Sequence, residues 1–297
     1  MDWDLFKDTA AAFAVDKMVA VDVGARWGIG DRWQQLGDLV EVFGFDPDPA
    51  ECELLNSMSP PNVHYIPLAL GESARTAILH LTVEPACSSL YRPIPAVSQL
   101  LPESACTAAV GTQSVALQSF DAWKQEQGVG PVSVMKLDTQ GSELGVLRGA
   151  QNALRDVQLL EIEVEFNPLY EGQPLFGDID HYLRQHGFVL WQLGHTVHYS
   201  SRHLHGMALL MPAVSYFDSN PISYERGAGQ LYWAHAYYTR TELAPATPGS
   251  VSVDQGMRAA CVAAAYGLYD LAYMALQKIE PGPTAERVAR LMVSVRQ

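Results

Sequence analysis

A turn that contains three glycines follows the first apolar run of the chain. It lies within the segment Val21-Asp-Val-Gly-Ala-Arg-Trp-Gly-Ile-Gly30, with glycine at positions 24, 28 and 30. Glycine lets the backbone approach a ligand closely, and the helix expected after the turn offers free N–H groups to an anion. The spacing matches neither the G-x-G-x-x-G dinucleotide motif nor the G-x-x-x-x-G-K-[ST] phosphate loop. It therefore argues against NAD and ATP, and on its own an ordinary tight turn explains it equally well.

An acid, Asp46, ends the second apolar run, 24 residues after Asp22. In an open α/β sheet, a carboxylate about 20 residues past the glycine turn accepts hydrogen bonds from ribose hydroxyls. The alternative is a helix N-cap, because Asp46 or Asp48 directly precedes an expected helix. The two roles are compatible. Together, the glycine turn and this acid favour a ligand that contains adenosine without a pyrophosphate.

A third polar group, Lys136-Leu-Asp-Thr-Gln-Gly-Ser-Glu143, comes where another buried strand should end. Ligands bind at the carboxyl edge of a parallel sheet, so we expect Asp138 to face the same crevice as Gly24 and Asp46. Ser142 and Glu143 are better explained as the start of the next helix, where a hydroxyl caps free N–H groups and an acid faces the positive end.

Three glutamates, at positions 161, 163 and 165, alternate along the following strand. With a strand's period of two they project to one face. Buried carboxylates are costly unless they are paired, coordinated or protonated. Either the end of this strand is solvated and Arg or Lys neighbours pair with the acids, or Glu163 or Glu165 lies near a reacting group.

Four histidines, at positions 195, 198, 203 and 205, lie within eleven residues. A zinc site is conceivable, but the spacing matches no standard pattern and no cysteine accompanies it. A polar hairpin near the mouth of a pocket is the favoured interpretation, and His195 could act there as a base.

Apolar runs and helical stretches alternate along the chain and must position these groups. The runs predict strands at 18–23, 39–45, 63–67, 132–137, 159–166, 189–193 and 207–211, and helices at 29–36, 48–58, 119–127, 142–154 and 176–186. This alternation predicts an α/β fold with a mostly parallel sheet and helices on both faces. The last two strands suit an antiparallel hairpin, and residues 76–117 are interpreted as an insertion with extra strands over one edge.

The end of the chain is rich in alanine, and helices are predicted at 229–240, 254–268, 269–279 and 284–295. We therefore expect two domains, residues 1–215 and a helical appendage over 216–297. The apolar surface of these helices must pack on the first domain or on a second copy of the chain. The tyrosine-rich start of the appendage favours a role at the pocket mouth or in a homodimer contact.

Composition limits the possible partners. The chain has 297 residues, 48% apolar and 18% charged, and a formal net charge of −14 at pH 7. Such an acidic surface without a basic patch disfavours nucleic acid and anionic membranes. No apolar run approaches the roughly 20 residues of a membrane span, and the acidic start lacks the basic region of a signal peptide, so we expect a cytoplasmic protein. The four cysteines have no paired spacing that would predict disulfides or zinc.

Several of these segments resemble the FkbM family of S-adenosylmethionine-dependent methyltransferases. The resemblance covers roughly residues 18–211 and rests on Val21-Asp-Val-Gly-Ala, Phe43-Gly-Phe-Asp-Pro, Lys136-Leu-Asp-Thr-Gln-Gly-Ser-Glu, Val146-Leu-Arg-Gly-Ala150 and Glu163-Val-Glu-Phe-Asn-Pro-Leu-Tyr. It implies a seven-stranded class I methyltransferase (Rossmann-like) sheet whose last strand is antiparallel. It also implies S-adenosylmethionine as cofactor. The residues implied for its methionine part are Asp22, Gly24, Ala25, Arg26 and Gly28, those for its ribose Asp46 and Pro47, and those for its adenine Ala69 and Leu70.

The resemblance further implies methylation of a hydroxyl oxygen on a small molecule such as a sugar or a polyketide. The protein must then align the hydroxyl with the methyl group and help to remove its proton. Gln140 stands where many relatives carry an acid, so Asp138 is the first candidate base, with Glu163, Glu165 and His195 as alternatives. A Mg²⁺ ion held by Asp138 and a glutamate could serve instead. The competing interpretations are an inactive methyltransferase-like binding module and, less favoured, a nucleotide-dependent oxidoreductase.

Overall fold

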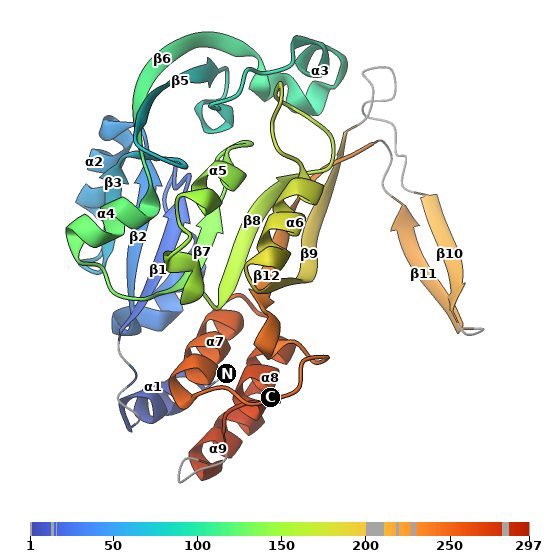
Figure 1. Ribbon diagram of the computed structural model, residues 1–297. Helices are drawn as coiled ribbons and strands as arrows, with labels where there is room; N and C mark the ends of the chain where they lie inside the picture. The colour runs from blue at the N-terminus through green and yellow to red at the C-terminus, as the bar shows by residue number, and fades with distance from the viewer. Residues whose placement is uncertain are drawn as a thin grey trace.

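The computed structural model describes residues 2–12, 15, 17–199, 211–217, 220–226, 230–280 and 285–296. A seven-stranded sheet forms its centre (Figure 1). The strands lie in the order β3 (Val63–Pro67), β2 (Val40–Asp46), β1 (Met18–Val23), β7 (Val132–Leu137), β8 (Leu159–Glu165), β12 (Gln230–Arg240) and β9 (Phe188–Tyr199). The strands from β3 to β8 run parallel, and β12 runs antiparallel to both β8 and β9. The predicted mostly parallel sheet is therefore confirmed.

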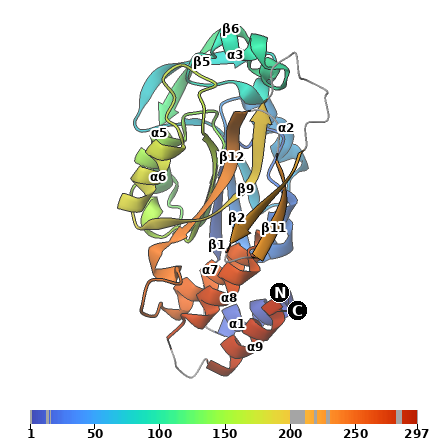
Figure 2. The same ribbon diagram turned by 90° about the vertical axis from the view of Figure 1, so that its right-hand side faces the viewer.

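The inner strands are apolar because helices cover both faces of the sheet. Buried residues of the sheet contribute to two separate hydrophobic clusters, one with each set of helices. One face carries α4 (Phe120–Gln127), α5 (Glu143–Arg148) and α6 (Phe176–Gln185). The other carries α1 (Trp3–Ala12), the 3-10 segment η1 (Asp31–Leu39), α2 (Pro49–Met58) and the C-terminal helices. In Figure 2, α5 and α6 lie on one side of the sheet and α2 on the other.

The three alternating glutamates continue one of these faces. Leu159, at the start of β8, belongs to the cluster that includes the C-terminal helices. Because side chains alternate along a strand, Glu161, Glu163 and Glu165 follow on that same face toward the carboxyl end of β8. All three are buried. The face is therefore apolar beside the C-terminal helices and acidic at the carboxyl edge.

The insertion between β3 and α4 forms a small sheet of its own above the carboxyl edge (Figure 1). Its strands are β4 (Ala69–Leu70), β6 (Ala109–Gln118) and β5 (Arg75–Thr82), in that order. The short helical segments η2 (Pro85–Cys87), α3 (Pro95–Leu100) and η3 (Pro102–Thr107) connect β5 to β6. The predicted extra strands are thus present, and they place a roof over the site.

The predicted helix at 229–240 is wrong, because these residues form strand β12 between β8 and β9. From Gln230 onward, burial alternates residue by residue over most of the strand, which is the period of a strand and not of a helix. The abundance of alanine concealed this pattern. Strand β12 lies within 216–297, so that segment is not wholly a helical appendage; the division into two domains at 215 and 216 stays a prediction.

Strand β9 pairs with β12. Of the strand predicted at 207–211, residues 207–210 lie outside the described part of the chain, and Met211 begins β10. The hairpin of β10 (Met211–Phe217) and β11 (Asn220–Arg226) is a separate two-stranded sheet.

The remaining C-terminal helices agree with the prediction. They are α7 (Val253–Ala265), α8 (Tyr269–Gln277) and α9 (Ala285–Arg296). They pack with α1 below the sheet, at the end opposite the roof (Figures 1 and 2). None of the helices in the described ranges is both long and apolar enough to cross a membrane.

Candidate functional site

A cavity of about 700 Å³ lies at the carboxyl edge of the sheet, between the ends of β1, β2 and β7 and the roof. Most of the predicted site residues line it: Gly24, Arg26, Gly28, Asp46, Pro47, Ala69, Leu70, Asp138 and Glu163. Asp22, Ala25 and Glu165 are buried and are not part of the wall. His195 lies on β9, and its side chain is outside the described part of the structure. The structure therefore brings most of the predicted groups to one place.

The glycine turn is required by the backbone around it. Gly24 has a φ of +87°, and a Cβ at this position would collide with the backbone carbonyl of Asp138. Its N–H donates to the carbonyl of Phe45 at 2.9 Å. Because of this close approach of β1, β2 and β7, the backbone at Gly24 carries no side chain beside the cavity. This fits a ligand packed against the turn.

The two acids after β2 have separate roles. Asp48 caps α2, because its Oδ1 accepts from the backbone N–H groups of Ala50 at 3.0 Å and Glu51 at 3.4 Å. Asp46 is not the cap, and its Oδ1 accepts from the N–H of Asp48 at 2.8 Å. Arg26 pairs with Asp48 at 3.1 Å and lies 3.7 Å from Asp46. Burial raises the pKa of Asp46, and the Asp48 N–H and Arg26 partly oppose this.

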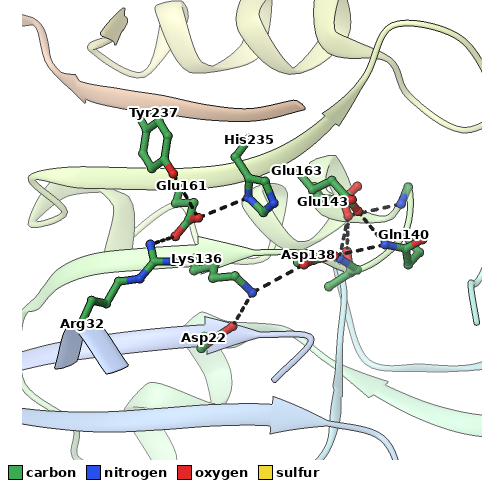
Figure 3. Close-up of polar contacts among 12 residues, drawn as sticks. Asp22, Arg32, Lys136, Asp138, Gln140, Glu143, Glu161, Glu163, His235 and Tyr237 are labelled. Atoms are coloured by element: carbon green, nitrogen blue, oxygen red, sulfur yellow. Dashed lines mark hydrogen bonds and ion pairs between the residues drawn. The ribbon is translucent and has the colours of Figure 1, made fainter. Parts of the chain in front are cut away.

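A half-buried lysine joins the ends of β1 and β7 (Figure 3). Lys136 Nζ lies 3.2 Å from Asp22 Oδ1 and 3.5 Å from Asp138 Oδ2. Burial alone would lower the pKa of Lys136, but the two carboxylates outweigh it and raise that pKa above its usual range. Burial raises the pKa of Asp22, partly against the effect of Lys136. Asp22 thus supports Lys136 from inside the sheet, while Lys136 and Asp138 face the cavity.

An amide bridges two acids at the end of β7 and β8 (Figure 3). Gln140 Nε2 donates to Asp138 Oδ1 at 3.1 Å and to Glu163 Oε2 at 2.6 Å, and its Oε1 accepts from the Tyr170 hydroxyl at 2.9 Å. Burial would raise the pKa of Asp138, but Lys136 and hydrogen bonds from Glu163 and Gln140 lower it below its usual range. Burial and the charge of Asp138 raise the pKa of Glu163 well above its usual range. The pair therefore favours the carboxylate on Asp138 and disfavours a second negative charge on Glu163.

A second cluster surrounds Glu161 deeper on the same face (Figure 3). Arg32 Nη1 lies 2.6 Å from Glu161 Oε2, His235 Nδ1 lies 3.2 Å from Oε1, and the Tyr237 hydroxyl lies 3.4 Å from Oε1. Burial would raise the pKa of Glu161, but His235 and Arg32 outweigh it and lower that pKa. Glu161 is therefore a buried carboxylate held by cationic and polar partners.

The two remaining acids are buried away from the cavity. One oxygen of Glu143 accepts from the N–H and hydroxyl of Thr139 at 2.6 and 3.0 Å, and burial still raises the pKa of Glu143 to about 7. Burial raises the pKa of Glu165 well above its usual range, and neither of its carboxyl oxygens makes a hydrogen bond of good geometry. Ser142 starts α5 without a side-chain cap bond, which corrects the predicted capping role.

Comparison with known protein families identifies the family of this chain. The methyltransferase FkbM domain matches residues 22–190, more than half of the chain. The chain belongs to this family. The protein is therefore an S-adenosylmethionine-dependent methyltransferase, and Gly24 and Asp46 lie in the wall of its carboxyl-edge cavity.

Solved structures to which the chain shows some similarity include further methyltransferases. Magnesium protoporphyrin IX methyltransferase from Synechocystis PCC 6803, with bound S-adenosylmethionine, is 9% identical, with 80% of this chain and 76% of that chain covered and a TM-score of 0.33. The 23S rRNA methyltransferase ErmE is 11% identical, with 100% and 99% covered and a TM-score of 0.34. A TehB-like methyltransferase from Corynebacterium glutamicum is 12% identical, with 80% and 87% covered and a TM-score of 0.32. No curated protein matches the chain.

Metal ligation was an open alternative for this FkbM methyltransferase. Within the described residues, no group of three or more histidine, cysteine, aspartate or glutamate side chains is placed to hold a metal ion. Two of the four clustered histidines, His203 and His205, lie outside that part of the chain.

Sequence reasoning missed the partners that hold the acids of this methyltransferase. His235 and Trp233 line the cavity, yet they fall in the segment predicted as a helix. Their alternation with Tyr237 was the available signal, because positions 233, 235 and 237 share one face of a strand. Arg32 comes from η1, more than 120 residues before Glu161, and no local pattern predicts that pairing.

Proposed function

We propose that this methyltransferase transfers the methyl group of S-adenosylmethionine to a hydroxyl oxygen of a small molecule. The observation that carries the proposal is the division of one cavity into two chemically different ends. One end has the glycine turn and Asp46, and the other has Asp138, Glu163 and His235 beneath the roof. A volume of about 700 Å³ lies within the usual range for small-molecule sites.

The first end is suited to the cofactor. Asp46 would accept hydrogen bonds from the ribose hydroxyls, and the backbone beside Gly24 would lie against the methionine part, close to Lys136 and the buried Asp22. Ala69 and Leu70, which begin the roof, would contact the adenine. Bound S-adenosylmethionine supplies an electrophilic methyl group; the chain's own residues orient the acceptor and accept its proton.

The second end favours an acceptor without phosphate or carboxylate groups. Among the described residues of the wall, both long cationic side chains are already paired, Lys136 with Asp22 and Asp138, and Arg26 with Asp48. The roof adds the apolar side chains Leu79, Leu81, Leu90 and Val110. This supports a neutral hydroxyl-bearing acceptor with an apolar body, which the roof would shield from water.

Charge supports a small molecule over a nucleic acid. The net charge of −14 repels phosphate backbones, and the acceptor end is itself lined by acids. Asp138 is proposed to accept the hydrogen bond of the acceptor hydroxyl, because Lys136 and Gln140 hold it as a carboxylate at the cavity wall. The cytoplasmic location and the homodimer stay predictions.

The proposal is tested by methyl transfer from labelled S-adenosylmethionine. The full chain would be incubated with a panel of neutral hydroxylated metabolites, with their phosphorylated counterparts, and with RNA. We expect product only with neutral hydroxylated acceptors, and the product should carry a methyl ether. Labelling of RNA would contradict the acceptor class. Cofactor binding by calorimetry without transfer to any acceptor would favour the inactive binding module.

A further inference from the structure

The proton of the acceptor needs a destination, and the three acids first considered for it are poorly suited. The pKa of Asp138 is lowered chiefly by Lys136, so this carboxylate is a weak base. Burial and Asp138 raise the pKa of Glu163, which disfavours its carboxylate form, and its Oε2 already accepts from Gln140 at 2.6 Å. Glu165 is buried and is not part of the cavity wall. A different group must accept the proton efficiently.

We propose, resting on the function proposed above, that His235 is the general base of the methyl transfer and that Glu161 is its positioning residue. His235 is part of the cavity wall on the same side as Asp138 and Glu163. Its side chain is 26% exposed, while the Nδ1 atom is buried and faces Glu161 at 3.2 Å. Nε2 is therefore the ring nitrogen available to an acceptor in the cavity.

The register of β12 against β8 fixes this arrangement. His235 pairs with Glu163 across the two strands, Tyr237 with Glu161, and Trp233 with Glu165. Directly opposite residues project to the same face, so the imidazole of His235 lies on the face that carries the three glutamates of β8. The ring of Trp233 lies edge-on to it, with 5.8 Å between the ring centroids. The imidazole of His235 thus lies between the Trp233 ring and the Glu161 carboxylate.

Glu161 can orient the imidazole because it is fixed from behind. Arg32 holds its second oxygen at 2.6 Å, and the Arg32 guanidinium lies 4.5 Å from the ring centroid of Tyr266, at the end of α7. Arg32 and His235 keep the pKa of Glu161 low despite burial, so it is a carboxylate that favours a proton on the facing Nδ1. The 3.2 Å contact lacks the alignment of a good hydrogen bond, which is common before a ligand binds.

A bond forms between the acceptor oxygen and the methyl carbon, and the bond from that carbon to sulfur breaks, with its electron pair left on sulfur as a neutral thioether. The hydroxyl proton passes to His235 Nε2. The resulting imidazolium faces the Glu161 carboxylate, and its proton then leaves to water. Asp138 accepts the hydrogen bond that orients the hydroxyl and stays ionised throughout.

Other charged groups act on His235 and enter any pH dependence. Glu161 and Glu163 reach it from β8, and Asp138 from β7 lies near enough to interact with its charge. Lys136 lies beside Asp138 at 3.5 Å, and Arg32 beside Glu161 at 2.6 Å. Histidine is the side chain whose charge ordinarily changes between pH 5 and 8. We therefore expect an acidic limb in the pH profile of kcat/KM, where protonated His235 cannot act as a base.

The test uses the full chain with an acceptor that the wild type methylates. His235→Gln should lower kcat about 100-fold or more, with KM and the affinity for S-adenosylmethionine within about threefold, and the acidic limb should disappear. His235→Asn serves as a second variant, and cofactor affinity reports that each variant is folded.

Glu161→Gln should lower kcat about tenfold and move the acidic limb to lower pH, because a neutral amide stabilises the imidazolium less. The control His64→Gln changes a histidine on β3 that pairs with Glu41 and is not part of the cavity wall, so it should leave all values unchanged.

Two results would overturn the inference. One is a His235→Gln variant that keeps its kcat within threefold together with the acidic limb; the other is loss of that limb in Asp138→Asn alone. If the wild type methylates no hydroxyl, the proposed function fails instead. The ring is then examined by ¹⁵N NMR of labelled histidine at pH 8, where the proton is expected on Nδ1. A proton on Nε2 would contradict the Glu161–His235 arrangement without reference to any acceptor.

Discussion

The two ends of the cavity are built in different ways. At the cofactor end, the lining residues directly follow consecutive strands: Gly24 after β1, Asp46 at the end of β2, and Ala69 shortly after β3. At the acceptor end, the groups come from η1, β7, β8 and β12, which span about 200 residues of sequence. One end is held by backbone hydrogen bonds between parallel strands, the other by a network of side-chain charges.

This difference determines which substitutions each end is sensitive to. The cofactor end depends on the backbone at Gly24, where no Cβ fits. The acceptor end depends on the balance between the acids Asp138 and Glu161 and their partners Lys136, Arg32 and His235. Substitutions at the first end should therefore change folding and cofactor affinity. Substitutions at the second should change turnover and the response to pH.

The largest effect is expected from Gly24→Ala. The new Cβ would collide with the Asp138 carbonyl, and φ is +87°. Strain and overpacking together should cost about 3–5 kcal/mol of unfolding free energy. Gly128→Ala is the matched control, because Gly128 also has a positive φ of +65° but has open space around it, so only about 1 kcal/mol should be lost. Urea unfolding of both variants measures this, and equal losses would show that the close approach at Gly24 is unimportant.

Glu143→Gln should give the next largest effect, on the pH dependence of stability. Burial raises the pKa of Glu143 to about 7, whereas the unfolded chain titrates near 4.5. Between these values the folded state binds more protons, so stability falls as pH rises and levels off above about 7. The shift corresponds to about 3 kcal/mol. Unfolding at pH 5 and pH 8 should show a smaller difference in the variant, while Glu53→Gln, an exposed change on α2, should behave as the wild type. An unchanged difference in Glu143→Gln would contradict the assignment.

The cofactor end could be predicted from sequence because its signals are local. The residues Val21-Asp-Val-Gly-Ala and Phe43-Gly-Phe-Asp-Pro combine a buried strand with the turn residues that follow it. In a parallel sheet, strand ends meet at one edge, so their order suffices to bring Gly24, Asp46 and Asp138 together. The side-chain contacts of Arg26 with Asp46 and Asp48 could not be predicted in the same way.

The acceptor end could be predicted only in part. The spacing of Glu161, Glu163 and Glu165 indicated one acidic face, and all three acids are buried. The partners His235 and Tyr237 depend on the antiparallel insertion of β12 between β8 and β9, which pairs residues about 70 apart. Because residues 229–240 were predicted as a helix, His235 was not placed on that face. The wrong period was assigned to this segment, so the residues that β12 contributes to the site were not predicted.

Asp138→Asn tests the acceptor end directly. The change keeps the shape of the side chain and removes its charge, so the hydroxyl loses its orienting partner and Lys136 loses a counter-ion. We expect kcat to fall about 100-fold, with cofactor affinity within about threefold. The assay would be run with and without a chelator. Activity kept under both conditions would exclude Asp138 both as a working carboxylate and as a metal ligand.

Asp46→Ala tests the cofactor end. Charge-assisted hydrogen bonds from two ribose hydroxyls are worth about 1.5–3 kcal/mol each at most, so affinity for S-adenosylmethionine should fall at least about tenfold. Asp48→Ala should instead lower stability by about 1 kcal/mol, because it removes the cap of α2. Calorimetry and thermal melts separate the two outcomes. Unchanged affinity in a folded Asp46→Ala protein would contradict the ribose assignment.

The smallest effect is expected where the C-terminal helices meet the acceptor end. The Tyr266 ring supports the Arg32 guanidinium at 4.5 Å, and its buried hydroxyl makes no hydrogen bond of good geometry. Tyr266→Phe keeps the ring and removes an unsatisfied polar group, so kcat should stay within about twofold and the Tm should be equal or slightly higher. Tyr266→Ala removes the ring, and with it a cation–π contact worth about 0.5–2 kcal/mol, so Arg32 should hold Glu161 less firmly and kcat should fall severalfold. If the two variants lost the same activity, the hydroxyl of Tyr266 and not its ring would be the group that affects turnover. That result would contradict the proposed support of Arg32 by the ring.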